Sequence, residues 1–326
     1  MFLRREEEHD PERVASRPDP DLMAQEVKRL PPEQCLLESG KYAVMHAKAH
    51  QIPNLLYEIG RVREITFRHA GEGTGRAVDL DRFDLYYTHL FLWNKETEEV
   101  VGGYRLGRVD LIVGRFGKKG LYTSSLFDYK DGFLHHIDAG IELGKSFVRH
   151  SYQKLYTPLL LLWKGIGHFV ARNPQYSILF GPVTVSNAND SLARQIMVAF
   201  LTINHFAPDL ARFIRPTASL RTLSAKKRGL RLATRLPSDI EELSAIISDI
   251  EADRKRVPVL LRQYVKLGGR LMGFAADPSL SNDLDGLLLV DLRKIDRKIL
   301  DRFMGEDGSA SFVNYHEESP TRDLAS

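Results

Sequence analysis

The sequence has few of the features that would place it outside the ordinary globular class. It has one cysteine, Cys35, which cannot form an internal disulfide, so nothing indicates an oxidising compartment. Its longest apolar run, residues 159–163, is far too short to span a membrane. The first residues lack the apolar core of a signal peptide. We therefore expect a cytoplasmic protein with no transmembrane segment.

An excess of charge of one sign is also lacking. The 326 residues include 46 basic and 43 acidic side chains, a formal net charge of only +3. This balance does not favour nucleic acid as a partner, and no nucleic-acid-binding motif is present. A hydrophobic content of 43% is enough for a substantial core.

The hydrophobic pattern predicts strands and helices in alternation rather than a bundle or a repeat array. Strands are expected where apolar residues alternate, and helices where they recur at intervals of three and four. The central part of the chain therefore predicts an α+β fold with a mixed sheet. The expected strands are 41–49, 85–93, 100–106, 137–148 and 176–183, and the expected helices are 53–68, 158–171 and 192–206.

The ends of the chain are polar and predict a three-part organisation. Residues 1–38 are expected to be a flexible tail with a short helix near 22–30, and residues 303–326 a second flexible tail. Residues 39–302 are expected to form one domain, with 220–302 as its C-terminal extension. Within the extension we expect a basic run at 221–235, helices at 239–253 and 258–267, and strands at 271–276 and 287–292.

Charged side chains occur at places where their neighbours favour burial. A buried charge is costly unless it is paired or used, so such positions predict one shared polar cleft. Four short motifs follow each other in order: Arg-x-x-x-Phe, Asp-x-x-Asp, Tyr-Arg-Leu and Glu-x-Gly followed by a basic residue. The residues in them are Arg63, Phe67, Asp81, Asp84, Arg105, Glu142 and Lys145.

This order of motifs resembles the N-acyltransferase branch of the GNAT superfamily. That branch includes the acyl-homoserine lactone synthases and, closer to this sequence, the ornithine lipid N-acyltransferases, often labelled hemolysin-like. The resemblance implies a GNAT-like, mostly antiparallel sheet flanked by helices, with a C-terminal helical and strand extension. Two positions depart from the pattern. Lys145 stands where the family usually has Arg, and the Trp that the lactone synthases carry shortly after Phe67 is missing.

The resemblance also implies an acyl carrier protein thioester as the acyl donor, with no cofactor. Acetyl-CoA-dependent GNAT enzymes hold the pyrophosphate on a glycine-rich turn. The corresponding residues here, 149–157, contain no glycine. Side chains keep the amides of such a turn away from a phosphate. His135, His136 and Asp138 have no further partner at ligand spacing, so we expect no metal site.

Glu142 and Arg105 are the catalytic candidates. A carboxylate on an apolar strand has its pKa raised toward working pH, which suits a general base or proton relay. The alternative is that Glu142 forms a structural ion pair with Lys145 or Arg105. The resemblance further implies that backbone amides of the Glu142 strand stabilise the oxyanion where that strand separates from its neighbour.

The remaining candidates are expected to bind substrate. A cation can hold the carboxylate of an amino acid, and a carboxylate can hold its ammonium group or order the arginines. Each cation could instead be a solvated surface charge, and the two aspartates could be ordinary loop residues before a strand. The substrate-binding candidates are Arg63, Phe67, Asp81, Asp84, Lys145 and Arg149.

The function that the resemblance implies is transfer of a long-chain acyl group, with or without a 3-hydroxyl, to the α-amine of an amino acid such as ornithine. This is the first step in making an amino-acid-containing lipid. A separate O-acyltransferase is expected to complete the pathway, because no histidine here is followed five residues later by aspartate. The basic run at 221–235 is a candidate contact for an acidic carrier protein or an anionic membrane surface. Two alternatives stay open: a synthase of acyl-homoserine-lactone-type signals, and a non-catalytic hemolysin-like protein that binds membrane or carrier.

Overall fold

A computed structural model describes residues 11–185, 191–218, 237–251, 256–277 and 283–318. Within these residues eight strands form one sheet in the order β1-β2-β3-β4-β6-β7-β10-β9, and β5 and β8 form a separate pair. The strands are β1 (Cys35–Ser39), β2 (Tyr42–Lys48), β3 (Thr88–Asn94), β4 (Glu99–Arg108), β5 (Phe127–Tyr129), β6 (Gly140–Val148), β7 (Ile178–Val185), β8 (Ile214–Pro216), β9 (Arg270–Asp277) and β10 (Asp283–Asp291).

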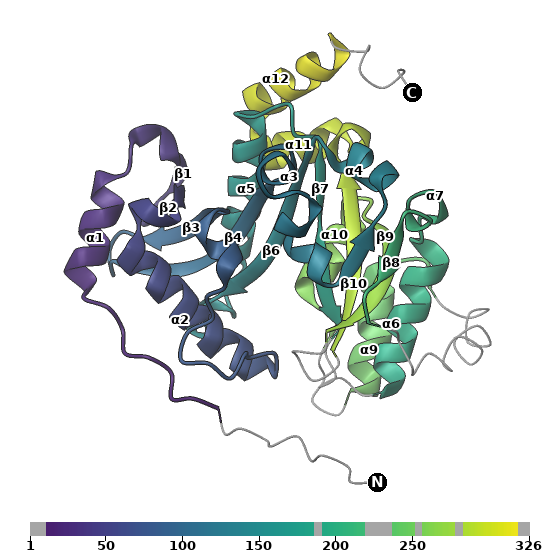
Figure 1. Cartoon of the computed structure of the whole chain (residues 1–326), viewed down its shortest axis with the longest axis horizontal. Helices are drawn as coiled ribbons and strands as arrows, with labels where there is room; N and C mark the ends of the chain where they lie inside the picture. The colour runs from purple at the N-terminus through teal and green to yellow at the C-terminus, as the bar shows by residue number, and fades with distance from the viewer. Residues whose placement is uncertain (1–10, 186–190, 219–236, 252–255, 278–282, 319–326) are drawn as a thin grey trace.

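Helices flank this sheet on both sides (Figure 1). The hairpin β3–β4 and the Pro-initiated helix α2 lie close to their predicted positions. The described helices are α1 (Pro20–Arg29), α2 (Pro53–Ala70), α3 (Val109–Phe116), α4 (Asp131–Ile137), α5 (Tyr156–Ala171), α6 (Ser191–Asn204), α7 (Pro208–Ala211), α9 (Ile240–Ile250), α10 (Val259–Lys266), α11 (Arg297–Met304) and α12 (Glu306–Glu317). The α+β class predicted from the sequence is confirmed.

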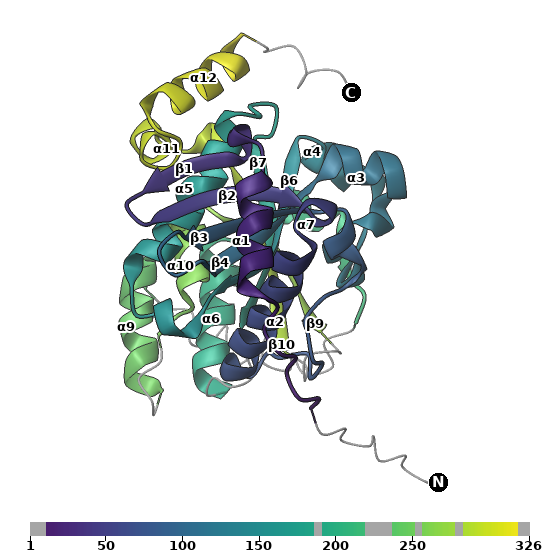
Figure 2. The ribbon, with the colours of Figure 1, turned by 90° about the vertical axis from the view of Figure 1, so that its left-hand side faces the viewer.

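Three hydrophobic clusters fill the space between the sheet and the helices. The largest packs α5, α6, α9, α10 and α11 against one face of the sheet. On the opposite face, one cluster joins α1 and α2 to β2 and β3, and another joins α3 and α4 to β7, β9 and β10. Helix α1 packs beside α2 (Figure 2). Two separate hydrophobic clusters therefore cover this face of the sheet, and the charged side chains described below lie between them.

Among the strand pairs of this sheet that the structure describes, β6 and β7 form the parallel one, and they pair over Gly140–Glu142. Both strands continue, β6 to Val148 and β7 to Val185. Beyond Glu142 the β6 strand remains paired with β4, but with a bulge at Lys145, whose φ of 49° is in the left-handed region. The β6–β7 ladder thus ends at Glu142, although the Leu143 carbonyl oxygen still lies close to Gly181, and the two strands separate beyond that point.

The N-terminal part of the chain agrees with the prediction in one element and differs in another. The short helix expected near residues 22–30 is α1, but residues 35–39, expected to belong to the flexible tail, form the edge strand β1, which pairs with β2. The sequence is polar on average, but Met23 and Val27 lie one turn apart on one side of α1 and are buried in the cluster with α2. This narrow apolar stripe packs the helix against α2 instead of leaving it in a tail.

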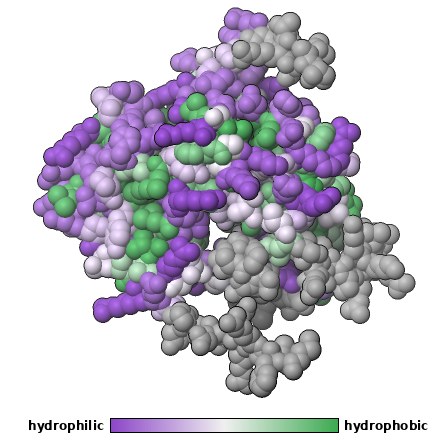
Figure 3. All heavy atoms as spheres, in the orientation of Figure 1, coloured by the Kyte–Doolittle hydropathy of each residue, from purple (hydrophilic) through white to green (hydrophobic). Residues whose placement is uncertain are grey.

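The C-terminal part differs in the same way. Residues 306–317, expected to be flexible, form α12, in which Phe312 is buried. The predicted basic run at 221–235 lies outside the described residues, and the division into domains stays a prediction. No described helix is both long enough and apolar enough to cross a membrane. The face seen in Figure 3 is mostly hydrophilic, with hydrophobic residues in a few small areas.

Replacement of Gly181 by alanine tests the close approach that ends the β6–β7 pair. A methyl group there would lie 2.1 Å from the carbonyl oxygen of Leu143, whereas at Gly273 on β9 the nearest atom is 3.6 Å away. We expect Gly181→Ala to lower the free energy of unfolding by about 1–3 kcal/mol in denaturant titrations. Gly273→Ala is the control and should change it little. Equal effects would contradict the packing described here.

Candidate active site

A chain of alternating charges connects α2 to β4. The Arg63 guanidinium on α2 forms two hydrogen bonds with the Asp84 carboxylate, Nη1 to Oδ1 and Nη2 to Oδ2, each 2.9 Å. Arg105 on β4 contacts the same carboxylate at 3.4 Å and donates to Asp81 Oδ1 at 2.7 Å. Four of the predicted residues therefore meet in one network.

The network continues through Asp79, which the sequence analysis did not single out. Its carboxylate lies 3.3 Å from Arg63 Nε and accepts hydrogen bonds from Lys145 Nζ at 3.0 and 3.1 Å. The Lys145 ammonium also lies 5.6 Å from the centre of the Phe67 ring. Three cations and three carboxylates thus alternate from Lys145 to Asp81.

Burial makes the middle of this network its most constrained part. Arg63, Arg105 and Asp84 are 1–2% exposed, whereas Lys145 is 15% and Asp81 25% exposed. Burial alone would raise the pKa of Asp84, but the guanidinium groups of Arg63 and Arg105 hold that pKa well below its ordinary value. The Asp84 carboxylate is therefore ionised throughout the physiological pH range. The two ends of the network, Lys145 and Asp81, reach solvent.

Glu142 lies beside this network but is not part of it. Its Oε1 accepts from the Thr123 amide at 2.6 Å and from the Thr123 hydroxyl, and its Oε2 accepts from the Tyr122 amide at 3.0 Å and from the Tyr87 hydroxyl. Among the described residues it forms no ion pair with Lys145 or Arg105. The carboxylate is held by hydrogen bonds from the 3-10 turn Tyr122–Ser125 and from one tyrosine.

Tyr87 connects Glu142 to Arg105. The Arg105 guanidinium carbon lies 5.1 Å from the ring centres of both Tyr87 and Tyr122, and 5.4 Å from that of Phe83. Within the part of the chain that the structure describes, Arg105 Nε and Nη2 are buried without a hydrogen-bond partner. An arginine enclosed by aromatic rings, with two donors unused, suits a planar anion.

Sequence reasoning missed Asp79, Tyr87 and Thr123. The one available signal was the pair of tyrosines directly after Asp84, at the start of a buried strand. Nothing local marks Asp79 or Thr123, because Asp79 meets Lys145 across 66 residues of chain and Thr123 meets Glu142 across 19.

Further carboxylates lie on the β10 side of the opening, near Lys145. Asp283 and Asp285 are 2% and 3% exposed, and Thr184 on β7 donates to Asp285 at 2.7 Å. Burial, together with the charges of these two aspartates, raises the pKa of Glu72 to about 7, which Lys145 partly opposes. Glu72 therefore lies within electrostatic range of Lys145 and of both aspartates.

Arg149 lies away from this network. Its guanidinium contacts Glu58 at 3.1 Å and Glu99 at 3.5 Å, and its Nε donates to the Val100 carbonyl at 3.0 Å. These contacts fasten the end of β6 to α2 and to the start of β4.

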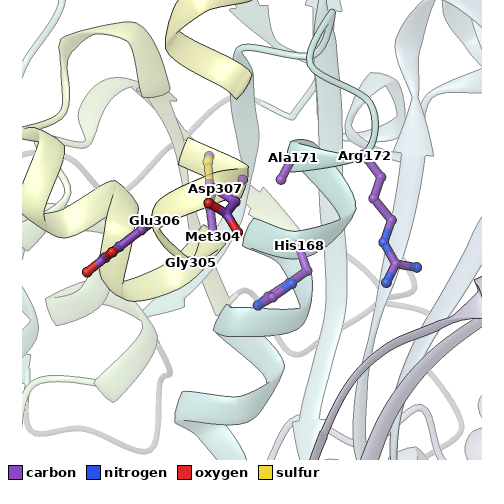
Figure 4. A pocket seen from close by; sticks show the side chains of 8 residues that line it. His168, Ala171, Arg172, Met304, Gly305, Glu306 and Asp307 are labelled. Atoms are coloured by element: carbon purple, nitrogen blue, oxygen red, sulfur yellow. The ribbon is translucent and has the colours of Figure 1, made fainter. Parts of the chain in front are cut away.

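The described residues contain no cluster of three or more His, Cys, Asp or Glu that could hold a metal. A surface pocket of about 430 Å³ lies between α5 and the start of α12, lined by residues such as His168, Arg172 and Asp307 (Figure 4). It contains none of the predicted site residues.

Comparison with known proteins gives the class. Residues 62–163 match the family described as acetyltransferase (GNAT) domain. The chain is 32% identical over 233 residues to the glycine N(alpha)-acyltransferase of Phocaeicola vulgatus, covering 68% of this chain and 71% of that protein. It is 27% identical over 255 residues to the L-ornithine N(alpha)-acyltransferase of Rhodobacter capsulatus, covering 73% and 86%.

Among solved structures, the chain is similar to the CoA-dependent acyl-homoserine lactone synthase BjaI at 11% identity and a TM-score of 0.40, covering 82% of this chain and 96% of that one. From the sequence matches, the chain belongs to the GNAT superfamily and, within it, to the N-acyltransferases. It is an acyltransferase, and the resemblance predicted from the sequence is confirmed.

Removing the Asp84 carboxylate takes away the anion that the buried guanidinium groups of Arg63 and Arg105 share, and leaves Asp79 as the one remaining carboxylate beside Arg63 among the described residues. We expect Asp84→Ala to lower the free energy of unfolding by about 3–5 kcal/mol, measured in denaturant. Asp128→Ala, which breaks the exposed pair with Lys118, serves as control and should cost less than about 1 kcal/mol. A similar small cost for both would show that the network is not structurally important.

His89 gives a pH prediction. Burial lowers its pKa to about 4, against the opposing effect of Asp84, and its Nε2 lies 2.8 Å from the Asp84 carbonyl oxygen. On acidification below about 6.5 the unfolded chain protonates this histidine while the folded chain does not, so stability falls. Between pH 7 and 4 we expect wild type to lose up to about 3 kcal/mol more than His89→Gln. Parallel stability curves would contradict this assignment.

Proposed function

We propose that this protein transfers an acyl group from the thioester of an acyl carrier protein to the α-amine of a small amino acid, glycine or ornithine. The observation that carries the proposal is Arg105: a buried guanidinium with two unused donors, one tyrosine away from the Glu142 carboxylate. The names of the relatives support the class of acceptor.

Arg105 is proposed to hold the carboxylate of the acceptor. Its Nε and Nη2 are unused, while its Nη1 is fixed by Asp81. Two parallel N–H donors match a carboxylate, and the aromatic rings keep water from competing. Asp81 is partly exposed, so the acceptor has a route to Arg105 from the solvent end of the network.

Glu142 is proposed to act as a proton relay through Tyr87 rather than as a direct base. All four acceptor positions of its carboxylate are occupied by hydrogen bonds, so a substrate ammonium cannot bond to it without displacing one. Tyr87 donates to Glu142, and its oxygen also accepts from the Tyr122 amide at 2.9 Å. A proton leaving the ammonium group would pass to the Tyr87 oxygen while the Tyr87 proton passes to Glu142.

The freed amine nitrogen then attacks the thioester carbonyl carbon, forming the C–N bond. The C–S bond breaks, and the thiolate takes up one of the two protons on the nitrogen while the other stays as the N–H of the amide product. Amides of β6 beyond Glu142, where pairing with β7 has ended, are the candidates for stabilising the oxyanion. Glycine at 144 leaves open space there, since no atom lies within 4 Å of an added methyl group.

The other predicted residues are proposed to support this geometry. Arg63 and Asp84 fix the position of Arg105 through their buried pair. Lys145 and Phe67, at the partly exposed end, are proposed to contact the substrates. Arg149 is proposed to hold the end of β6 in place, because its contacts lie with Glu58, Glu99 and Val100 rather than with the cleft.

A carrier protein rather than CoA is proposed as donor because the connection from β6 to α5 contains no glycine. The product would be an acyl amino acid that a separate O-acyltransferase extends to a lipid. Because a long-chain product of this kind must enter a membrane, the protein is proposed to act at the inner face of a membrane, in peripheral contact with anionic lipid.

The activity test is incubation of the protein with hexadecanoyl carrier protein and either glycine or ornithine, followed by mass spectrometry of the products. We expect N-hexadecanoyl glycine or N-hexadecanoyl ornithine. A lactone formed only when S-adenosylmethionine is added would indicate a signal synthase instead. Absence of any transfer with a folded protein would favour the non-catalytic alternative.

Tyr87→Phe tests the relay. Loss of general acid–base assistance typically costs about a hundredfold or more, so kcat should fall by about that factor with little change in KM. Tyr86→Phe is the matched control, because the Tyr86 hydroxyl donates to the Gly120 carbonyl at 2.8 Å and not to Glu142. Unchanged kcat in Tyr87→Phe would leave Glu142 as a purely structural group.

Glu142→Gln tests the proton relay less directly than Tyr87→Phe, because it also affects the stability of the fold. Its amide N–H would face the N–H of Tyr122 or Thr123, leaving a buried donor unmatched at a cost of about 1–3 kcal/mol. Its activity should therefore be compared only at temperatures where the variant is shown to be folded.

A further inference from the structure

An exposed apolar surface lies at the Asp81 end of the network of alternating charges. Leu85 is 73% exposed, and Phe116, at the end of α3, is 42% exposed. Tyr86 connects them, because it follows Leu85 in the chain and its ring centre lies 4.4 Å from that of Phe116. Single exposed apolar side chains are ordinary on a protein surface, whereas adjacent ones indicate a contact surface.

Two arginines flank this apolar surface. The Arg115 guanidinium carbon lies 5.1 Å from the centre of the Phe116 ring, and that of Arg82 lies 4.8 Å from the centre of the Phe83 ring. Both arginines are exposed, and neither forms an ion pair with a carboxylate of the described residues. Their stems therefore cover aromatic rings while their charges stay available to an anionic partner.

Two lysines add to the positive charge. Lys119 is exposed and precedes Gly120, whose carbonyl oxygen accepts a hydrogen bond from the Tyr86 hydroxyl at 2.8 Å. Lys48 Nζ donates to the Tyr86 carbonyl oxygen at 3.4 Å. Burial and the charge of Arg108 lower the pKa of Lys48 to about 8. Within the part of the chain that the structure describes, neither lysine forms an ion pair with a carboxylate, so the surroundings of Tyr86 carry an excess of positive charge.

Aromatic rings connect this surface with the place where the product is proposed to form. The Tyr86 ring centre lies 5.4 Å from that of Tyr87 and 6.2 Å from that of Phe83. Both of these rings enclose the Arg105 guanidinium. An acyl amino acid that leaves Arg105 along these rings would reach the apolar surface.

The two ends of the charge network indicate which partner fits. The acyl donor is proposed to approach where the β6–β7 ladder ends, near Lys145, whereas the apolar surface adjoins Asp81 at the opposite end. Apolar side chains among cations without carboxylate partners match an anionic bilayer, whose headgroups attract the cations and whose acyl layer accepts the apolar groups. Helix α3 lies at the edge of the molecule in Figure 2, where a flat surface can reach it.

We propose that Leu85, Tyr86 and Phe116, flanked by Arg82, Arg115 and Lys119, dock the protein on an anionic phospholipid bilayer. The inference rests on the proposed function and deepens it, since it names the surface through which the long-chain product would pass to the membrane. Tyr86 suits the boundary between headgroups and acyl chains, because its ring is apolar and its hydroxyl is polar.

Sedimentation with phospholipid vesicles tests this surface. The probes are vesicles of phosphatidylcholine alone and vesicles of equal parts phosphatidylcholine and phosphatidylglycerol. We expect wild type to bind the anionic vesicles more tightly than the neutral ones. For the anionic vesicles, Leu85→Gln/Lys119→Gln should raise the apparent dissociation constant at least about tenfold, because it removes one inserted leucine and one cation.

Leu22→Gln/Lys28→Gln is the matched control. Leu22 is 44% exposed on α1, and Lys28 on the same helix has an exposed side chain, so polarity and charge change by the same amount as in the test variant. The control should bind anionic vesicles within about twofold of wild type. Equal weakening in both double variants would overturn the proposal, and so would a wild type that does not sediment with anionic vesicles.

Acyl transfer from hexadecanoyl carrier protein, measured without vesicles, separates this proposal from the proposed function. We expect Leu85→Gln/Lys119→Gln to keep the kcat, the KM and the melting temperature of wild type, because both side chains are exposed. Unchanged vesicle affinity with a raised KM for the carrier protein would assign the surface to the carrier and overturn membrane docking. If wild type acylates neither glycine nor ornithine but the variant loses vesicle binding, the docking surface stands and the proposed acceptors are wrong.

Discussion

The buried pair between Arg63 and Asp84 is the interaction on which the arrangement of the site depends. It joins α2 to the segment before β3, and Asp84 in turn contacts Arg105 on β4. Each of these ions would be unfavourable alone in this setting, and each is made tolerable by its neighbours. The network fills the space between two apolar clusters on one face of the sheet, so it fixes helix, loop and strand together.

The second constraint is the short parallel pairing of β6 with β7. Three residues of each strand pair, and then the ladder ends, which leaves the facing edges of both strands without ladder hydrogen bonds to each other. The bulge at Lys145 turns neighbouring side chains of β6 to opposite faces. The charged network therefore lies on one face of this short stretch of strand, and the largest hydrophobic cluster lies on the other.

Much of the fold could be predicted from the sequence, because α2, α5, β3 and β4 show clear periodicity and marked ends. The parts that could not be predicted are those where local composition misleads. Helix α12 buries Phe312 from an otherwise polar segment, and the edge strand β1 lies in a stretch whose polar composition predicted a flexible tail. The sequence predicted that charged residues in apolar surroundings would lie together, and this holds for Arg63, Asp81, Asp84, Arg105 and Lys145. The hydrogen-bond partners of Glu142 could not be predicted, since its bonds with Thr123 and Tyr87 depend on segments far apart in the sequence. Nor did the sequence show that Arg149 would pair with Glu58 and lie away from the network.

The central claim is that the Arg105 guanidinium and the Tyr87–Glu142 pair together receive an amino acid acceptor. A crystal structure of the protein with N-hexadecanoyl glycine bound tests it most directly. The account predicts the product carboxylate within hydrogen-bonding distance of Arg105 Nε or Nη2, with the amide nitrogen next to the Tyr87 hydroxyl. A product bound with its carboxylate elsewhere, for example in the pocket between α5 and α12, would contradict it.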